Sequence, residues 1–255
     1  MILVISGTEE GKTIVRRLHA EGRSILTTVA TEYGRKIFEQ MDLESFCLQG
    51  RLDTDGFSQL IQEKGIDLVV DATHPYAVQV SMNALNACKK MNIPYLRYER
   101  PGTGIPDSPL IHKVMSVDEA VSKARVIGTK IFLTIGVSGV KKFICLKNEK
   151  ELYVRILPVP EHIASCIDAG IPPMNIIAMH GPFSEDLNRV IFRQYQITTI
   201  VTKNSGDAGG ISEKISAALR EGIETIVIER PRMDFPAVYS SIDEIVARVR
   251  NPEML

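Results

Sequence analysis

The sequence predicts an α/β protein built from two Rossmann-like halves, each a doubly wound parallel sheet, with a cleft between them. Three observations lead to this fold class. Short, wholly apolar runs alternate with longer stretches of helical period. A segment of the first half aligns with a segment of the second half without a gap. Glycine-rich and polar turns follow several apolar runs, at the edge where open α/β sheets bind ligands.

The N-terminal half carries the alternation most clearly. A strand that is apolar throughout is buried on both faces, as parallel strands covered by helices are. The alternation therefore predicts a sheet with right-handed crossovers. Strands are predicted at residues 1–5, 24–30, 45–50, 66–72 and 93–99. Helices are predicted over residues 10–21, 33–41, 54–64 and 76–91, the last with Pro75 at its start.

The C-terminal half repeats the plan. Ser184 and Ser241 are suited to cap the helices that follow them, because their hydroxyls can accept backbone N–H groups. Strands are predicted at residues 129–135, 151–157, 175–179, 197–202 and 224–229. Helices are predicted over residues 160–168, 184–194, 210–221 and 241–250.

An internal repeat relates the two halves. Residues 66–101 and 196–231 align as strand, polar turn, helix, strand and Glu-Arg-Pro, which places His74 opposite Asn204. Two α/β units can resemble each other by chance, but that alternative leaves the same architecture.

The domain boundary is expected in the Gly- and Pro-rich residues 101–109. We therefore expect a first domain at residues 1–105 and a second at 106–255, whose C-terminal helix could pack back on the first. Because such a pair of halves forms its own cleft, we expect a monomer.

Composition excludes several classes of protein. In 255 residues, 30 Lys and Arg balance 31 Asp and Glu, which argues against a general nucleic-acid binder. The four cysteines form no C-x-x-C pair, so we expect neither a disulfide framework nor a metal site. No apolar run approaches the roughly 20 residues that span a bilayer, and no export signal is evident. We therefore expect a cytoplasmic protein without a membrane partner.

The turn Ser6–Gly11 lies between the first strand and the first helix, where such sheets bind ligands. Gly7 allows a tight turn, N–H groups at the helix start can hold a diphosphate, and Thr8 could add a hydroxyl donor. The pattern G-x-x-x-G is shorter than the dinucleotide fingerprint, so a plain turn is the alternative.

The end of the second strand bears on which nucleotide would bind. Thr31 and Arg35 would suit a 2′-phosphate and so favour NADPH, whereas Glu32 could reverse the preference toward NADH. Further polar groups follow the third and fourth strands, namely Arg51 and the turn Thr73–Tyr76. These groups lie at the same edge of the sheet and could line a ligand site.

The second half offers corresponding turns at residues 136–139, 180–184 and 203–210. The last is rich in glycine and begins with Lys203, but it lacks the P-loop order. Basic residues flank the two Glu-Arg-Pro ends and together could supply the local positive field that a polycarboxylate needs; they are Arg97, Arg100, Arg230 and Arg232. No Ser/His/Asp arrangement suggests covalent hydrolysis.

These motifs together resemble the precorrin-6A reductase family of corrinoid (vitamin B12) biosynthesis. The matching segments are ILVISGTEEG, VATEYGR, GRLD, VDATHPYA, YLRYERP, HGPFS, VTKNSGDAGG and VIERP, between residues 2 and 231. The resemblance implies two Rossmann-like halves with the active site in the cleft between them. It also implies that a reduced nicotinamide cofactor reduces one double bond of precorrin-6A or cobalt-precorrin-6A; the sequence leaves the presence of cobalt open.

The resemblance also implies residue roles. Cofactor binding would fall to Gly7, Thr8, Glu9, Gly11, Thr31 and Arg35, with Arg51, Thr73 and His74 near the nicotinamide. The macrocycle and its carboxylates would contact Arg97, Arg100, Ser138, Gly181, Pro182, Phe183, Lys203, Asn204, Ser205, Gly206 and Arg230. The Ser6–Gly11 turn and the turn at Asn204 would face each other across the gap.

A proton must follow the hydride, and Lys203 is our first choice of donor, with His74, Tyr76 or water as alternatives. Two other functions stay open from the residues alone. One is a nicotinamide-dependent reductase of a different acidic substrate, and the other is a non-catalytic nucleotide sensor.

Overall fold

The computed structural model describes residues 1–102, 104–206 and 209–251. The chain divides into two compact units: unit 1 comprises Met1–Pro101 and the segment from Pro231 onward, and unit 2 comprises Gly102–Arg230. The first boundary lies four residues before the expected one, and the C-terminal segment belongs to unit 1 rather than to the second domain expected at 106–255. The reason is that the apolar face of its amphipathic helix packs against the first helix of the chain, as the sequence had allowed.

Unit 1 holds a six-stranded sheet in which every pairing is parallel. The strand order is β3-β2-β1-β4-β5-β12, and the order reverses between β1 and β4. The strands are β1 (Ile2–Ile5), β2 (Ile25–Val29), β3 (Cys47–Gln49), β4 (Leu68–Asp71), β5 (Tyr95–Tyr98) and β12 (Val238–Tyr239). The helices are α1 (Glu9–Ala20), α2 (Glu32–Glu39), α3 (Thr54–Lys64), α4 (Val78–Met91) and α10 (Ile242–Arg250).

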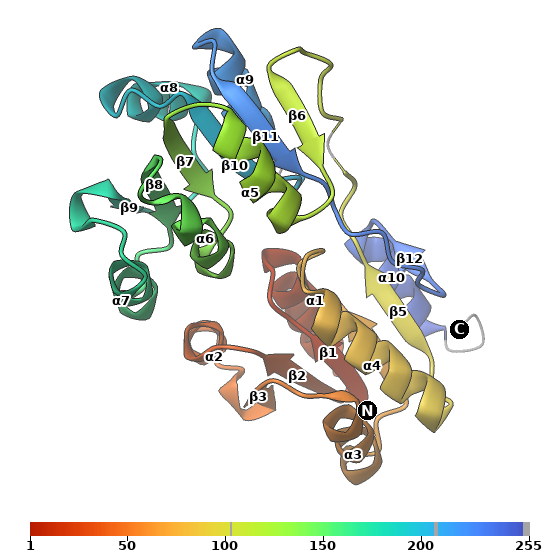
Figure 1. Ribbon diagram of the computed structural model, residues 1–255. Helices are drawn as coiled ribbons and strands as arrows, with labels where there is room; N and C mark the ends of the chain where they lie inside the picture. Colours follow the sequence, from red (N-terminus) through yellow and green to blue (C-terminus); the bar gives the residue numbers. More distant parts are fainter. Residues whose placement is uncertain (103, 207–208, 252–255) are drawn as a thin grey trace. The chain divides into compact units, whose positions relative to one another are not determined.

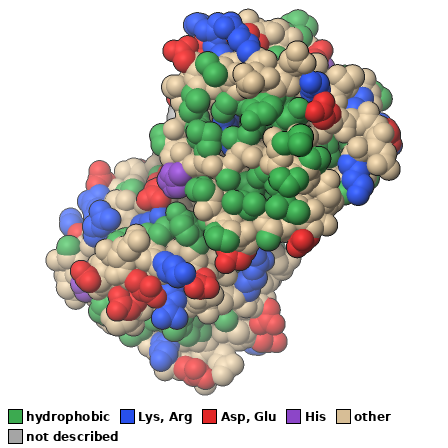
Figure 2. All heavy atoms as spheres, turned by 90° about the vertical axis from the view of Figure 1, so that its left-hand side faces the viewer, with side chains coloured by type: hydrophobic (Ala, Val, Ile, Leu, Met, Phe, Trp, Pro, Cys, Tyr) green, Lys and Arg blue, Asp and Glu red, His purple; other side chains and the backbone are tan. Residues whose placement is uncertain are grey.

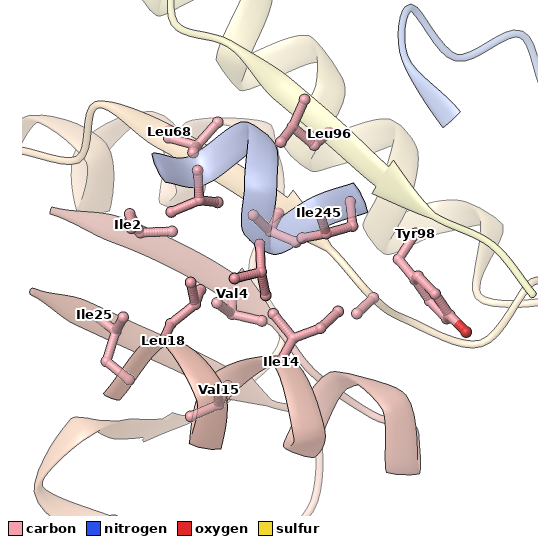
Figure 3. Packing of buried hydrophobic residues seen from close by; sticks show 14 of the residues in the cluster. Ile2, Val4, Ile14, Val15, Leu18, Ile25, Leu68, Leu96, Tyr98 and Ile245 are labelled. Carbon is pink, nitrogen blue, oxygen red and sulfur yellow. The ribbon is translucent and has the colours of Figure 1, made fainter. Parts of the chain in front are cut away.

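Helices cover both faces of this sheet (Figure 1). On one face α1 and α10 pack together, and Figure 3 shows Ile14 and Leu18 of α1 and Ile245 of α10 around Val4 of the central strand. On the other face α3 and α4 cover the sheet, with Phe57 fully buried. Burial on both faces explains why the strands read as unbroken apolar runs.

Unit 2 repeats this plan, again with every pairing parallel. Its order is β9-β8-β7-β10-β11-β6. The strands are β6 (Ile111–Val114), β7 (Lys130–Thr134), β8 (Glu151–Ile156), β9 (Ile176–Ala178), β10 (Thr199–Lys203) and β11 (Glu224–Ile228). The helices are α5 (Val117–Val126), α6 (Val137–Phe143), α7 (Pro160–Asp168), α8 (Glu185–Gln194) and α9 (Ile211–Arg220). Short 3-10 turns span Glu44–Phe46, Ile144–Leu146 and Pro173–Asn175.

The two strand orders correspond position by position, with β4 and β5 of unit 1 matching β10 and β11 of unit 2. These are the strands of the aligned sequence segments. The sixth position differs in origin, because β12 follows the other strands of its sheet in the chain and β6 precedes them.

Local signals explain several helix starts. Ser184 accepts a hydrogen bond from the N–H of Leu187, and Ser241 forms a full capping box, which confirms both predicted caps. Pro75, however, does not begin α4: it lies in a turn closed by the N–H of Ala77 on the carbonyl of His74. Residues 136–139 are not a simple turn either, since α6 begins at Val137.

Candidate active site

The turn after β1 is fixed by Thr8, the N-cap of α1. Its hydroxyl accepts the N–H of Gly11 at 3.1 Å and donates to the carbonyl of Ala72 at 3.0 Å. The hydroxyl proton expected to serve a ligand is therefore used within the protein. Because Ala72 follows β4, this bond joins the Ser6–Gly11 turn to the Thr73–Tyr76 turn at the point where the strand order reverses.

Gly7 and Gly11 serve this turn differently. A Cβ on Gly11 would lie 2.7 Å from Ser6 Oγ and 3.3 Å from Ala72 Cβ, so only glycine lets α1 approach the strand ends this closely. A Cβ on Gly7 would meet nothing within 4 Å. The turn is therefore closely packed at Gly11 and has open space at Gly7. A turn that admits a phosphate against a helix N-terminus needs such open space.

This contrast gives a paired prediction. Gly11→Ala should push α1 away from Ser6 and destabilise unit 1 by about 1–3 kcal/mol, while also weakening cofactor binding. Gly7→Ala should leave stability within about 0.5 kcal/mol and weaken cofactor binding alone. Urea unfolding and titration with NADPH check both. Equal losses of stability in the two variants would contradict the assignment.

Charged groups surround the first turn of α1. Helix N-termini attract anions, and Glu9 and Glu10 oppose that attraction. Each carboxylate has a cationic partner: Glu9 pairs with Lys12 at 2.6 Å, and Glu10 pairs with Arg100 at 3.2 Å. Arg100, expected at the macrocycle, thus contacts the Ser6–Gly11 turn of its own unit.

The end of β2 carries the groups expected at the adenosine ribose. Thr31 caps α2 by accepting the N–H of Gly34 at 3.1 Å. Glu32 is exposed and pairs with Lys36 at 3.0 Å, and this hydrogen bond and the Lys36 charge lower its pKa. Arg35 pairs with Glu39 at 3.2 Å. Arg51 lies exposed after β3.

A buried polar network supports the turn after β4. Asp71, the last residue of β4, accepts hydrogen bonds from the backbone and hydroxyl of Thr73 and from the Tyr95 hydroxyl. It also forms an ion pair with Arg97 at 2.8 Å. Burial, followed by the Asp71 charge, raises the pKa of Tyr95, which keeps this hydroxyl a donor. Phe235, from the returning C-terminal segment, lies against both Tyr95 and Arg97.

Arg97 therefore differs from its expected role. Its side chain is 1% exposed, and it also donates to Thr73 Oγ1 at 3.0 Å. A guanidinium in this position holds the turn and is not placed to contact a macrocycle. The sequence signal that we missed is Asp71 itself, a carboxylate at the end of an apolar strand, which needs a buried partner.

The supported turn presents His74 and Tyr76, whose rings lie 5.4 Å apart. The Nδ1 atom of His74 accepts the N–H of Tyr76 at 3.3 Å, so a neutral His74 carries its proton on Nε2. Both side chains are partly exposed at the carboxyl end of β4, beside the cofactor turn.

In unit 2, the matching loop follows β10. Asn204 is buried; its side-chain amide donates to Glu229 at 3.0 Å, and its backbone carbonyl accepts from Arg230 Nε at 2.8 Å. Arg230 thus helps to shape the loop. Burial lowers the pKa of Lys203, in the direction that a proton donor needs. Ser205 and Gly206 continue the loop, while Asp207 and Ala208 lie outside the described residues.

The turn at residues 180–184 is tied to β8 by residues that sequence reasoning missed. Arg155 of β8 stacks against the Phe183 ring, its guanidinium carbon 4.0 Å from the ring centroid. Asn188 accepts from Arg155 at 2.8 Å and donates to the carbonyl of Ser184 at 2.8 Å. A Cβ on Gly181 would lie 3.0 Å from Cε2 of the Phe183 ring. The sequence could have marked Arg155 as a buried charge, because it interrupts the otherwise apolar end of a predicted strand.

The remaining expected substrate residues lie on the surface of unit 2. Pro182 is exposed in the same turn, and Ser138 is exposed in the first turn of α6. Gly139 beside it repeats the packing of Gly11, because a Cβ there would lie 2.8 Å from Ile135. Among the described residues, no group of three His, Cys, Asp or Glu side chains is arranged to hold a metal ion. No helix in the described part of the chain is long and apolar enough to cross a bilayer.

The strand order of both sheets defines an α/β protein with two Rossmann-like units. The model of the family "Precorrin-6x reductase CbiJ/CobK" matches residues 1–250. The chain is 34% identical to cobalt-precorrin-6A reductase of Methanocaldococcus jannaschii over 98% of both chains. It is 34% identical to the same enzyme of Salmonella typhimurium, over 90% of this chain and 87% of that one. Precorrin-6A reductase of Rhodococcus erythropolis is 28% identical, over 97% and 95% of the two chains.

A solved structure of CobK precorrin-6A reductase has the same fold, with a TM-score of 0.79, 23% identity and coverage of 98% of this chain and 96% of that one. The chain belongs to the precorrin-6x reductase family. This confirms the predicted family and the α/β fold class. It also makes the chain an oxidoreductase of cobalamin biosynthesis that uses a nicotinamide cofactor.

Proposed function

We propose that this protein reduces one carbon–carbon double bond of precorrin-6A or cobalt-precorrin-6A by hydride transfer from NADPH or NADH. The observation that carries the proposal is the family match over residues 1–250, together with relatives of nearly equal length. The turns at the reversal point of the unit 1 sheet support it, because they are built as a nucleotide site is.

The residues present fit a nicotinamide cofactor. Gly7 leaves open space over the N-terminus of α1, and Gly11 brings that helix against the strand ends. The N–H groups at the start of α1 would hold the diphosphate, and Thr31 and Arg35 would hold the adenosine ribose or its phosphate. Arg51 and the Thr73–Tyr76 turn would lie near the nicotinamide, which supplies the hydride when the cofactor is bound.

We further propose a preference for NADPH. Glu32 pairs with Lys36 and Arg35 pairs with Glu39, and both pairs are exposed. A 2′-phosphate would attract the Arg35 guanidinium more strongly than neutral ribose hydroxyls would attract the Glu32 carboxylate. Titration with both cofactors tests this: NADPH should bind at least about tenfold more tightly, a difference of about 1.4 kcal/mol. Equal affinities for NADPH and NADH would contradict the proposed preference but would leave the reductase assignment unchanged.

In unit 2, Lys203, Asn204, Ser205 and Gly206, with the turn at Gly181, Pro182 and Phe183, would face the macrocycle. Lys203 would protonate the carbon next to the one that receives hydride, since burial lowers its pKa. His74, Tyr76 and water are the other candidate donors. We propose that the protein acts as a monomer in the cytoplasm.

The reductase activity is tested by incubating the protein with a precorrin mixture and NADPH. Loss of the near-ultraviolet absorbance of NADPH, with a reduced macrocycle in the product, is expected. Oxidation of NADPH only with a non-tetrapyrrole acid would indicate a different reductase. Tight NADPH binding without any oxidation would indicate a nucleotide sensor.

A further inference from the structure

Unit 2 buries two cations that the proposed mechanism does not use. Arg155 lies one residue before the end of β8 and is 7% exposed, and Lys214 lies in the first turn of α9 and is 6% exposed. The Lys214 ammonium donates to Thr202 Oγ1 at 3.0 Å, one residue before Lys203. Strands β8 and β10 flank β7 in the sheet, so both cations lie near the carboxyl end of the three central strands.

The hydrogen-bond partners of both cations are neutral. Arg155 donates to the Asn188 amide oxygen and lies over the rings of Phe132 and Phe183. Among residues 104–206 and 209–230, no carboxylate lies within ion-pair distance of Arg155 or Lys214. Burial lowers the pKa of Arg155 to about 10, and burial together with the Arg155 charge lowers that of Lys214 to about 7.

The charged groups around Lys214 are few. Glu213 on the same helix raises its pKa, but less strongly than burial and Arg155 lower it. On the neighbouring helix α8, Glu185 pairs with Arg220 and Arg189 pairs with Glu221, both toward the far end of α9. On β10, the nearest ionisable residue is Lys203. Among the described residues, the pair is thus a positive charge that no ion pair compensates.

Such an arrangement is costly unless a further anion offsets it, because unpaired charges lose their hydration on burial. Both cations lie beneath the two loops that the proposed function assigns to the macrocycle: Phe183 covers Arg155, and Lys203 follows the Thr202 partner of Lys214. Figure 2 shows acidic and basic side chains on the face it displays, with hydrophobic side chains between them. Because 30 Lys and Arg stand against 31 Asp and Glu in the sequence, a positive field has to come from local groups.

We propose that Arg155 and Lys214 form the anion-recognition element of unit 2, which attracts and orients a carboxylate side chain of the ligand. This inference rests on the proposed function, which supplies an acidic macrocycle as that ligand. The carboxylate favours the charged form of Lys214, so ligand binding and protonation of Lys214 assist each other.

The test compares wild-type protein with Lys214→Met and Arg155→Met, using uroporphyrin III, a tetrapyrrole with acetate and propionate groups, at saturating NADPH. Wild-type affinity, measured by quenching of porphyrin fluorescence, should fall as pH rises from about 6 to about 8. Lys214→Met should bind about tenfold more weakly at about pH 6 and lose the pH dependence. Arg155→Met should also bind more weakly, with the pH midpoint moved upward, because the Arg155 charge no longer lowers the pKa of Lys214.

Thermal unfolding without porphyrin separates recognition from a structural role. Replacing an uncompensated buried charge by an apolar side chain of similar length should keep or raise the unfolding midpoint in both variants. Lower midpoints in both would show that the pair is structural and would overturn the inference.

Wild-type affinity and pH dependence retained by both variants would also overturn it, while leaving the reductase assignment intact. Absence of porphyrin binding by the wild type would overturn it as well. The proposed function itself fails only if the precorrin assay with NADPH shows no reduction.

Discussion

Replacing Asp71 by alanine will destabilise unit 1 by about 3–5 kcal/mol. Asp71 and Arg97 form a fully buried ion pair, so the substitution leaves the buried guanidinium with only the more distant carboxylate of Glu99, 3.6 Å from its Nε. It also removes the acceptor of the Tyr95 hydroxyl and of the Thr73 backbone. The free energy of unfolding, measured in urea, reports this loss.

The matched control removes both charges. Asp71→Leu with Arg97→Met replaces the ion pair by apolar side chains and should recover most of the stability lost in Asp71→Ala. Thr73 loses its Asp71 acceptor in both variants, so the turn after β4 is no longer held. Both variants should therefore bind the cofactor more weakly than wild type, even where stability returns. A double variant as unstable as the single one would contradict the ion-pair account.

Replacing Lys203 by alanine will lower turnover by about 10²–10⁴-fold while cofactor binding stays unchanged, if Lys203 donates the proton as proposed. The donor must carry its proton. The wild-type rate should therefore fall as pH rises through a Lys203 pKa that burial has moved below its ordinary value. Single-turnover rates across pH, together with NADPH titration, measure both effects.

Lys203→Arg separates charge from proton transfer. Arginine keeps the positive charge but does not release a proton at ordinary pH, so substrate affinity should survive and turnover should not. Near-normal turnover in Lys203→Ala would remove Lys203 from the mechanism, and His74 and Tyr76 would then be tested in the same way.

The fold could be predicted where periodicity and caps agree. The helices at 54–64 and 160–168 match their predicted bounds, and Ser184 and Ser241 cap as expected. Strand β6 and helix α5 were missed because they follow the Gly- and Pro-rich segment, which was interpreted as a domain boundary. Helix α6 and strand β12 were missed as well. A Ser-x-x-Glu pattern at Ser116 and Glu119 marks the start of α5 and could have revealed it.

The sequence predicted which turns share one edge of the sheet, but not which side chains in those turns would pair with each other. The turns after β1 and β4 follow from the Gly-rich and Thr-His-Pro-Tyr segments, because strand ends of a parallel sheet share one edge. The partners of individual charges could not be derived, since they depend on which side chains meet in space. Arg97 and Arg100 were therefore predicted to contact the ligand, although Arg97 pairs with Asp71 and Arg100 pairs with Glu10. Lys214 sits on the apolar stripe of α9, a pattern that could have marked it as buried.

Isotope transfer tests the reductase assignment most directly. NADPH with both hydrogens at C4 replaced by deuterium is incubated with the protein and cobalt-precorrin-6A or precorrin-6A, and the macrocycle is analysed by mass spectrometry. The account predicts that one deuterium appears on a ring carbon of the reduced product while the other stays on the oxidised cofactor, and that the variant Lys203→Ala slows its appearance. A reduced macrocycle without deuterium would contradict it.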